Sequence, residues 1–129
     1  MHSTGALLID RLIAELPTDT VITDPASMDA YRWDRANDPN AGTPLAVVRA
    51  TCTEDVQATV RLAAATGTAV IPRGAGSGLS GGSTAMDGAI VLSLDRMREI
   101  RIEPATRMAV VQPGAFNAEV KAAAAARGL

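Results

Sequence analysis

Five glycines and two serines lie within residues 73–82, which follow directly on the largely apolar run 68–72. Glycine lets a backbone approach a ligand closely and adopt positive φ without a Cβ clash. Consecutive backbone N–H groups in such a loop form a concave site for anions, and Arg73 adds positive charge at the entrance. These residue types at this spacing predict a loop that binds phosphate.

Two familiar nucleotide motifs resemble this loop and do not fit it. Residues 76–81 match G-x-G-x-x-G, and Asp95 lies near the position of a ribose-binding acid. That fingerprint needs a helix that crosses back to the next strand, and a crossover takes about 10–12 residues. Only the six residues 83–88 are available here, and no Gly-Lys-Ser/Thr follows as in an ATP-binding loop. A plain flexible turn would not need five glycines, each of which costs folding entropy.

Composition argues against several other kinds of site. The 129 residues have a net charge of −2 and only 2% aromatic residues, which disfavours a nucleic-acid partner. Cys52 and His2 are single, so we expect no disulfide, metal site or histidine-dependent triad, and we expect His2 to be disordered. No segment reaches the roughly 20 apolar residues of a membrane helix, and residues 1–16 lack a signal-peptide pattern. We therefore expect a cytoplasmic protein without a transmembrane segment.

The elements around the loop predict an α+β fold with a small, partly parallel sheet. Apolar spacing, caps and breakers predict helices over 4–16, 25–31, 53–66 and 115–127. Short apolar runs predict strands over 45–49, 69–71, 89–94, 100–103 and 108–112. Strand, helix and strand in succession form a βαβ unit with parallel strands. The last two strands form a hairpin around residues 104–107.

Several side chains have expected structural roles. Ser3 or Thr4 should cap the first helix, and Thr53 the third. The third helix should pack through four residues, Val56, Val60, Leu62 and Ala63. Phe116 and Val120 should anchor the last helix. Residues 18–44 read as irregular, apart from the short helical turn.

The chain divides into an N-terminal helix with an irregular lead-in, residues 1–44, and the first part of a domain, residues 45–129. The last residues, Arg127-Gly128-Leu129, come directly after a predicted helix, where an α/β domain normally continues into a strand. We expect the chain to be the front part of a longer protein, truncated inside this domain.

Residues 72–82, Pro-Arg-Gly-Ala-Gly-Ser-Gly-Leu-Ser-Gly-Gly, resemble the pyrophosphate loop of one flavoprotein family. It comprises the FAD-linked oxidases with a p-cresol methylhydroxylase/vanillyl-alcohol oxidase (PCMH) type FAD domain. Residues 46–56 resemble its first strand and helix, and residues 110–114 its V-x-P-G turn. The loop is most similar to the glycolate oxidase D-subunit/D-lactate dehydrogenase branch. Ala50 and Cys52 depart from a proline and a serine common in the family.

The resemblance implies FAD as cofactor, held without a covalent bond because no histidine lies near Ser77. It assigns cofactor binding to Pro72, Arg73, Gly74, Ala75, Gly76, Ser77, Gly78, Leu79, Ser80, Gly81, Pro113 and Gly114. Residues 74–78 would offer N–H groups to the pyrophosphate, and Arg73 could pair with phosphate bidentately. Tyr31 and Trp33 could stack on a ligand, but we expect them to anchor the lead-in.

The implied reaction is oxidation of a 2-hydroxy acid, of the glycolate or D-lactate type, by hydride transfer to FAD. The whole protein would then need a small-molecule substrate and an electron acceptor. In this family the catalytic base and substrate clamps lie further along, so we assign no catalytic residue and expect the 129 residues alone to be inactive. Two alternatives remain open: a non-catalytic nucleotide- or phosphate-binding module, and the FAD domain of a UDP-sugar reductase.

Overall fold

The computed structural model describes residues 3–129, so the expectation for His2 lies outside the described residues. The helical elements are α1 (Thr4–Glu15), α2 (Pro25–Met28), the 3-10 turn η1 (Asp29–Tyr31), α3 (Thr53–Ala65) and α4 (Asn117–Ala125). The strands are β1 (Val21–Ile22), β2 (Ala46–Arg49), β3 (Val70–Arg73), β4 (Ile90–Ser93), β5 (Ile100–Glu103) and β6 (Met108–Val111). Within residues 3–129, no helix is both long and apolar enough to cross a bilayer.

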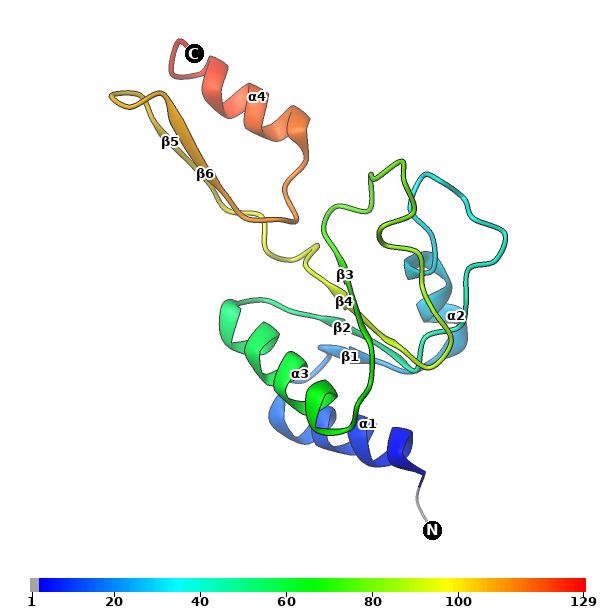
Figure 1. The fold of residues 1–129 in the computed structure, drawn as a ribbon. Coiled ribbons are helices and arrows are strands. Elements are labelled where there is room, and N and C mark those ends of the chain that lie inside the picture. The colour runs from blue at the N-terminus through cyan, green and yellow to red at the C-terminus, as the bar shows by residue number, and fades with distance from the viewer. Residues whose placement is uncertain (1–2) are drawn as a thin grey trace.

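Figure 1 shows two parts, which we call the sheet lobe (residues 3–97) and the hairpin lobe (residues 98–129). The sheet lobe contains four strands in the order β1-β2-β4-β3. β4 lies between β2 and β3 and is parallel to both, with Val91 opposite Val47 on one side and Ile71 on the other. The predicted parallel arrangement is therefore confirmed, and the carboxyl ends of three strands lie at one edge.

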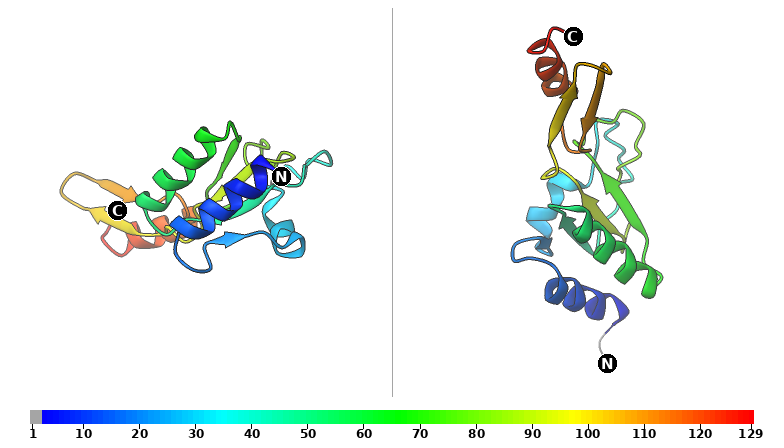
Figure 2. Two further views of the ribbon diagram at one scale, coloured as in Figure 1. Left: turned by 90° about the horizontal axis from the view of Figure 1, so that it is seen from below. Right: turned by 90° about the vertical axis from the view of Figure 1, so that its left-hand side faces the viewer.

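The alternation of side chains along β2 and β4 divides the core between two faces of the sheet. Val48 and Ile90 face α1 and α3, where they join Leu8 and Leu12 in the larger core cluster. Val47 and its partner Val91 belong to a second cluster on the opposite face, with Met28 of α2. Both views in Figure 2 show α1 and α3 side by side against the sheet.

One strand was not predicted. Val21 and Ile22 form β1, antiparallel to β2, inside the segment that we expected to be irregular apart from its helical turn. A two-residue strand is too short to show an alternating pattern in the sequence. It forms because β2 offers a partner, with Val21 opposite Val48.

Two predictions for α3 are wrong in detail. The N-cap is Cys52, and Thr53 is the first helical residue. Asp55 stabilises this turn instead, since its carboxylate accepts hydrogen bonds from Thr51 N at 2.8 Å and Thr51 Oγ1 at 2.7 Å. Val60 is 47% exposed, because each residue turns a helix by about 100° and Val60 directly follows the buried Thr59.

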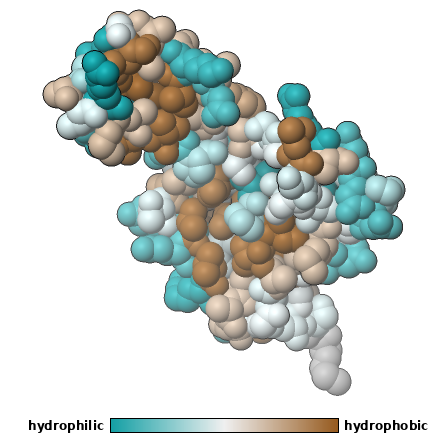
Figure 3. All heavy atoms as spheres, turned by 45° about the horizontal axis from the view of Figure 1, so that its top comes forward, coloured by the Kyte–Doolittle hydropathy of each residue, from teal (hydrophilic) through white to brown (hydrophobic). Residues whose placement is uncertain are grey.

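The hairpin lobe is thinly packed. β5 and β6 pair antiparallel, with Ile100 opposite Val111, and α4 contacts both strands. All four residues of β6 are exposed, and α4 contains no buried residue. Phe116, expected to anchor α4, is its N-cap and is 43% exposed. Figure 3 shows apolar atoms gathered on this lobe.

Candidate functional site

The glycine loop, residues 74–82, leaves the carboxyl end of β3, and residues 83–89 return the chain to β4. No helix intervenes, as the short spacing predicts. Gly76 and Gly81 have φ values of 70° and 78°, which glycine adopts without strain. The loop therefore lies at the sheet edge where ligands commonly bind in α/β folds.

The Pro113–Gly114 turn lies against the start of the glycine loop. A Cβ placed on Gly74 would be 2.7 Å from the Pro113 carbonyl oxygen. A Cβ placed on Gly114 would be 2.8 Å from the Met97 carbonyl oxygen and would collide with that of Leu94. Gly114 N also donates a hydrogen bond to Met97 O at 2.8 Å. The fold thus brings together two segments that were predicted separately, and it does so through positions that only glycine can occupy.

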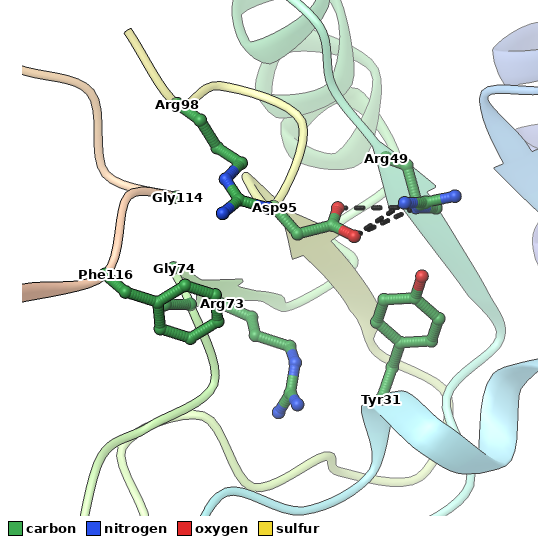
Figure 4. A pocket seen from close by; sticks show the side chains of 9 residues that line it. Tyr31, Arg49, Arg73, Gly74, Asp95, Arg98, Gly114 and Phe116 are labelled. Atoms are coloured by element: carbon green, nitrogen blue, oxygen red, sulfur yellow. Dashed lines mark hydrogen bonds and ion pairs between the residues drawn. The ribbon is translucent and has the colours of Figure 1, made fainter. Parts of the chain in front are cut away.

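A cavity of about 300 Å³ opens between these two segments. Four residues predicted to bind the cofactor line it: Arg73, Gly74, Ala75 and Gly114. Five further residues complete the lining: Tyr31, Arg49, Asp95, Arg98 and Phe116. Figure 4 shows their side chains directed toward the space in front of the strand ends. Three arginines and one carboxylate make the lining cationic, which suits an anionic ligand.

The other predicted site residues lie around the cavity without lining it. Pro72 is an exposed residue of β3, and Pro113 is exposed beside Gly74. The four residues Ser77–Ser80 project toward solvent, with Leu79 77% exposed. Gly76 lies against the Arg73 guanidinium, so that an added Cβ would collide with Nη2. Whether these residues contact the cofactor stays a prediction.

Arg49 and Asp95 form a partly buried ion pair on the cavity wall. Arg49 Nη2 donates to Asp95 Oδ2 at 2.7 Å, and Ser93 Oγ donates to Asp95 Oδ1 at 2.8 Å. Burial would raise the pKa of the Asp95 carboxyl, but the hydrogen bonds from Arg49 and Ser93 outweigh it and hold that pKa below its ordinary value. Asp95, which had the spacing of a ribose-binding acid, is therefore an ionised partner of Arg49 at neutral pH.

Tyr31 lies between two of the arginines. The Arg73 and Arg49 Cζ atoms are 5.8 and 6.0 Å from its ring centroid. Burial, followed by the nearby negative charge of Asp95, raises the pKa of the Tyr31 hydroxyl. The hydroxyl thus remains protonated at neutral pH and available as a hydrogen-bond donor in the cavity.

Sequence reasoning missed Arg49, Arg98 and Phe116 as lining residues. A signal for Arg49 existed: it is the last residue of the predicted strand over 45–49, and Asp95 directly follows the predicted strand over 89–94. The carboxyl ends of parallel strands share one sheet edge, so charged residues there can meet. No comparable local signal marks Arg98 or Phe116, which pair by a cation–π contact of 5.3 Å.

The Arg73 side chain is hydrogen-bonded to the lead-in segment that precedes residue 45. Its Nη1 donates to the Trp33 carbonyl oxygen at 2.5 Å, and Nη2 lies 3.5 Å from that of Ala30. The guanidinium therefore connects the start of the glycine loop to Ala30 of η1 and to Trp33, which lies two residues after η1. Bidentate pairing with phosphate would need the guanidinium to release or share these carbonyls, and stays a prediction.

Comparison with known proteins identifies the family. The family model described as FAD binding domain matches residues 44–129. The chain belongs to this family of FAD-binding domains. The resemblance read from the glycine loop is thereby confirmed, and FAD is the cofactor of the domain.

Three curated relatives illustrate the range of the family. The chain is 37% identical to a D-2-hydroxyglutarate dehydrogenase of Stutzerimonas stutzeri, over 98% of this chain and 27% of the relative. It is 34% identical to a D-lactate dehydrogenase of Archaeoglobus fulgidus, over 78% of this chain and 24% of the relative. It is 38% identical to glycolate oxidase subunit GlcD of Escherichia coli, over 67% of this chain and 17% of the subunit. The chain thus spans about a quarter or less of these relatives.

Solved structures confirm the predicted fold class. Substrate-bound p-cresol methylhydroxylase superposes with a TM-score of 0.83 at 22% identity, over 100% of this chain and 26% of the enzyme. The 4-ethylphenol oxidase from Gulosibacter chungangensis gives 0.84 at 28% identity, over 97% of this chain and 25% of the oxidase. The sheet lobe and the hairpin lobe together therefore form part of a PCMH-type FAD-binding domain.

The geometry of the site fits this cofactor. Gly74 and Gly114 leave room where a Cβ would strike the neighbouring backbone, and the cavity between them carries an excess of arginine. A pyrophosphate group has the charge and size for such a loop. Positive φ at Gly76 and Gly81 lets the loop curve around an anion.

Proposed function

We propose that this chain is the FAD-binding part of a flavin-dependent oxidoreductase that oxidises a small 2-hydroxy acid. The observation that supports this most is the meeting of the glycine loop and the Pro113–Gly114 turn at one cationic cavity, in a chain of this family. The relatives named for D-2-hydroxyglutarate, D-lactate and glycolate point to 2-hydroxy acids as the substrate class. A cytoplasmic location and a separate electron acceptor belong to the same proposal.

Within this proposal the chain binds and orients the cofactor. The backbone amides of residues 74–78 and the Ser77 hydroxyl would donate hydrogen bonds to the pyrophosphate. Pro72 and Arg73 would hold the entrance to the loop, and Leu79 and Ser80 would continue the wrap. Pro113 and Gly114 close the other side. FAD supplies the hydride acceptor when bound. No residue of this chain is assigned as the base that takes the hydroxyl proton.

We also propose that the attachment is non-covalent. Residues 72–82 contain no histidine, cysteine or tyrosine that could form a bond to the flavin. Acid precipitation of the FAD-loaded protein should leave all of the yellow colour in the supernatant. Flavin that remains with the precipitated protein would refute non-covalent binding.

A binding experiment separates this function from a plain phosphate-binding module. The purified chain is titrated with FAD, ADP and inorganic pyrophosphate, and binding is measured by calorimetry. FAD binding tighter than ADP binding supports the flavoprotein assignment, because the flavin half then contributes contacts. Equal affinity for FAD and ADP favours the simple anion module, and no affinity for FAD contradicts the proposal for this chain.

The reaction itself is tested by turnover. We expect the 129 residues to show no oxidation of D-lactate or glycolate with FAD and an artificial electron acceptor, because no base or substrate clamp is assigned within them. Measurable turnover by the purified chain would contradict this. The division into residues 1–44 and 45–129 stays a prediction as well.

A further inference from the structure

The lead-in residues 32–35 run beneath the glycine loop and bond to its surroundings at three points. Arg35 N donates to the Gly78 carbonyl oxygen at 2.9 Å, and Ala85 N donates to that of Arg32 at 2.9 Å. The Arg73 guanidinium bonds to the carbonyl oxygen of Trp33. Figure 1 shows this lead-in beside the loop. The loop thus rests on a segment that lies some 40 residues earlier in the chain.

Asp34 is the buried side chain of this segment. It is 5% exposed, and its Oδ1 accepts a hydrogen bond from Ala36 N at 2.9 Å. Its Oδ2 is fully buried, and no donor among residues 3–129 bonds to it. This oxygen lies 3.3 Å from the position that a Cβ on Gly78 would take. An unpartnered acceptor therefore sits directly under the middle of the glycine loop.

A second unpartnered oxygen lies under the same loop. Thr84 Oγ1 is buried without a hydrogen-bond partner in the described part of the chain. It lies 3.3 Å from the position of a Cβ on Gly81, whose φ of 78° marks the far turn of the loop. Buried polar atoms are nearly always paired in folded proteins, and an unpaired one costs free energy. Two such atoms therefore lie beneath one loop.

We propose that Asp34 is the positioning residue of the glycine loop. As the loop closes around the cofactor pyrophosphate, Asp34 Oδ2 accepts the backbone N–H of Leu79 or Ser80, and Thr84 Oγ1 bonds in the same way near Gly81. Because these amides turn inward, the remaining amides stay turned toward the anion. The inference rests on the proposed function only for the identity of the anion.

Burial supports a bond to the loop over a bond to the ligand. Asp34 Oδ2 is covered by protein, whereas the loop residues Ser77–Ser80 are exposed above it. A ligand on the outer face of the loop could not reach this oxygen, but a rotated peptide group of the loop could. A bare carboxylate below a phosphate would also repel it, and an N–H donated to the carboxylate reduces that repulsion.

The test compares Asp34→Asn with a matched control, Asp38→Asn. Asp38 forms the same kind of turn, since its Oδ1 accepts from Asn40 N at 2.8 Å. It is more exposed, and within residues 3–129 its hydrogen bonds join it to Trp33, Asn40 and Ala41 and not to the loop. Three quantities are measured on the whole chain: deuterium uptake of the peptide containing residues 74–82 with saturating FAD and with saturating inorganic pyrophosphate, the dissociation constant for FAD by equilibrium dialysis, and the melting midpoint without FAD.

For Asp34→Asn we expect faster deuterium uptake in the ligand-bound loop and about tenfold weaker FAD binding, since one charge-assisted hydrogen bond of the closed loop is lost. Its melting midpoint should stay equal or rise, because an unpaired buried charge has been removed. Asp38→Asn should match the wild type in all three measurements. A merely structural role would instead lower the melting midpoint together with the affinity.

The proposal would be overturned if loop deuterium uptake in Asp34→Asn equalled that of the wild type. It would also be overturned if Asp34→Asn and Asp38→Asn changed uptake equally. If Asp34→Asn does not fold, Thr84→Val carries the test, with a smaller change in uptake expected in the same direction. If the wild-type chain binds no FAD, the proposed function fails, whereas loop uptake with inorganic pyrophosphate still decides the role of Asp34.

Discussion

The sheet lobe and the hairpin lobe are built from similar strands and packed in opposite ways. The strands β2 and β4 are buried on both faces, whereas every residue of β6 is exposed. Valine and isoleucine are common in the strands of both lobes, so the strand propensities of the two lobes are similar. The lobes differ in how far these strand residues are buried. A two-stranded hairpin alone is marginally stable in water. The sheet lobe therefore supplies the stability, and the hairpin lobe supplies residues to the cavity.

The hairpin lobe is attached to the sheet lobe at one turn. The hairpin lobe is held to the sheet edge through the turn at Gly114, whose N–H bonds to Met97 O. Gly114 and Phe116 reach the cavity from this turn, while Arg49 and Asp95 reach it from the sheet. The cavity thus depends on the turn at Gly114, which is the joint between the strongly packed sheet lobe and the weakly packed hairpin lobe.

The largest expected effect tests the packing contrast with a matched pair of valines. Val91 in β4 is 0% exposed, and Val110 in β6 is 49% exposed. Val91→Ala should lower the free energy of unfolding by about 2–3 kcal/mol through lost burial and a cavity. Val110→Ala should change it by less than about 0.5 kcal/mol. Urea unfolding measures both, and equal losses would refute the contrast.

The next effect tests the joint. In Gly114→Ala the new methyl group meets the carbonyl oxygens of Leu94 and Met97, which should cost about 1–3 kcal/mol. Gly82→Ala is the control, because a Cβ there meets no atom within 4 Å. Hydrogen exchange should rise across residues 98–129 in the first variant and stay unchanged in the second. If exchange rises mainly in the sheet lobe, Gly114 is not the joint.

A third prediction compares one ion pair from each lobe. Asp95→Asn removes the partner of Arg49 and should cost about 1 kcal/mol at pH 7. Glu103→Gln breaks the more exposed pair with Arg101 in β5 and should cost less than about 0.5 kcal/mol. Chemical denaturation at pH 7 should give this order, and the reverse order would contradict it.

The Asp95 pair should also depend on pH. Because the pKa of Asp95 is lower in the folded protein than in the unfolded chain, its stabilisation is complete above the unfolded pKa of about 4. It is lost as the pH falls through the folded pKa. Wild type should therefore exceed Asp95→Asn in stability at pH 7 and approach it below about pH 4. A difference that stays constant over this range would show that charge plays no part.

The smallest effect concerns the surface of the sheet lobe. Arg61 of α3 pairs with Glu15 of α1 at 2.5 Å, but the two side chains are 63% and 40% exposed. Arg61→Ala should change the free energy of unfolding by less than about 0.5 kcal/mol. Thermal melting at low and high salt measures this. A loss comparable to that of Val91→Ala would mean that exposed charges, and not apolar burial, stabilise the sheet lobe.

Local patterns predicted the elements that depend on local interactions. The apolar spacing of α1 and α3 and the turn between β5 and β6 appear within a few neighbouring residues, and all of these elements form. β1 escaped prediction because its two residues become a strand only beside β2. Phe116 was misplaced because the predicted helix began at residue 115, whereas α4 begins at Asn117 and Phe116 is its N-cap beside the cavity.

The sequence by itself determined the glycine loop and its position between two strands, because glycine content, spacing and the missing crossover helix are local facts. The resemblance of this loop to a flavoprotein family supplied the cofactor class. Only the tertiary structure decided what surrounds the loop. Arg49 and Asp95 lie 46 positions apart and meet because β2 and β4 are neighbours in the sheet. Asp34 lies beneath Gly78 for a similar reason, since hydrogen bonds to Gly78 and Ala85, more than 40 residues away, hold the lead-in under the loop. Contacts between distant segments depend on strand order and burial, which no short stretch of residues records.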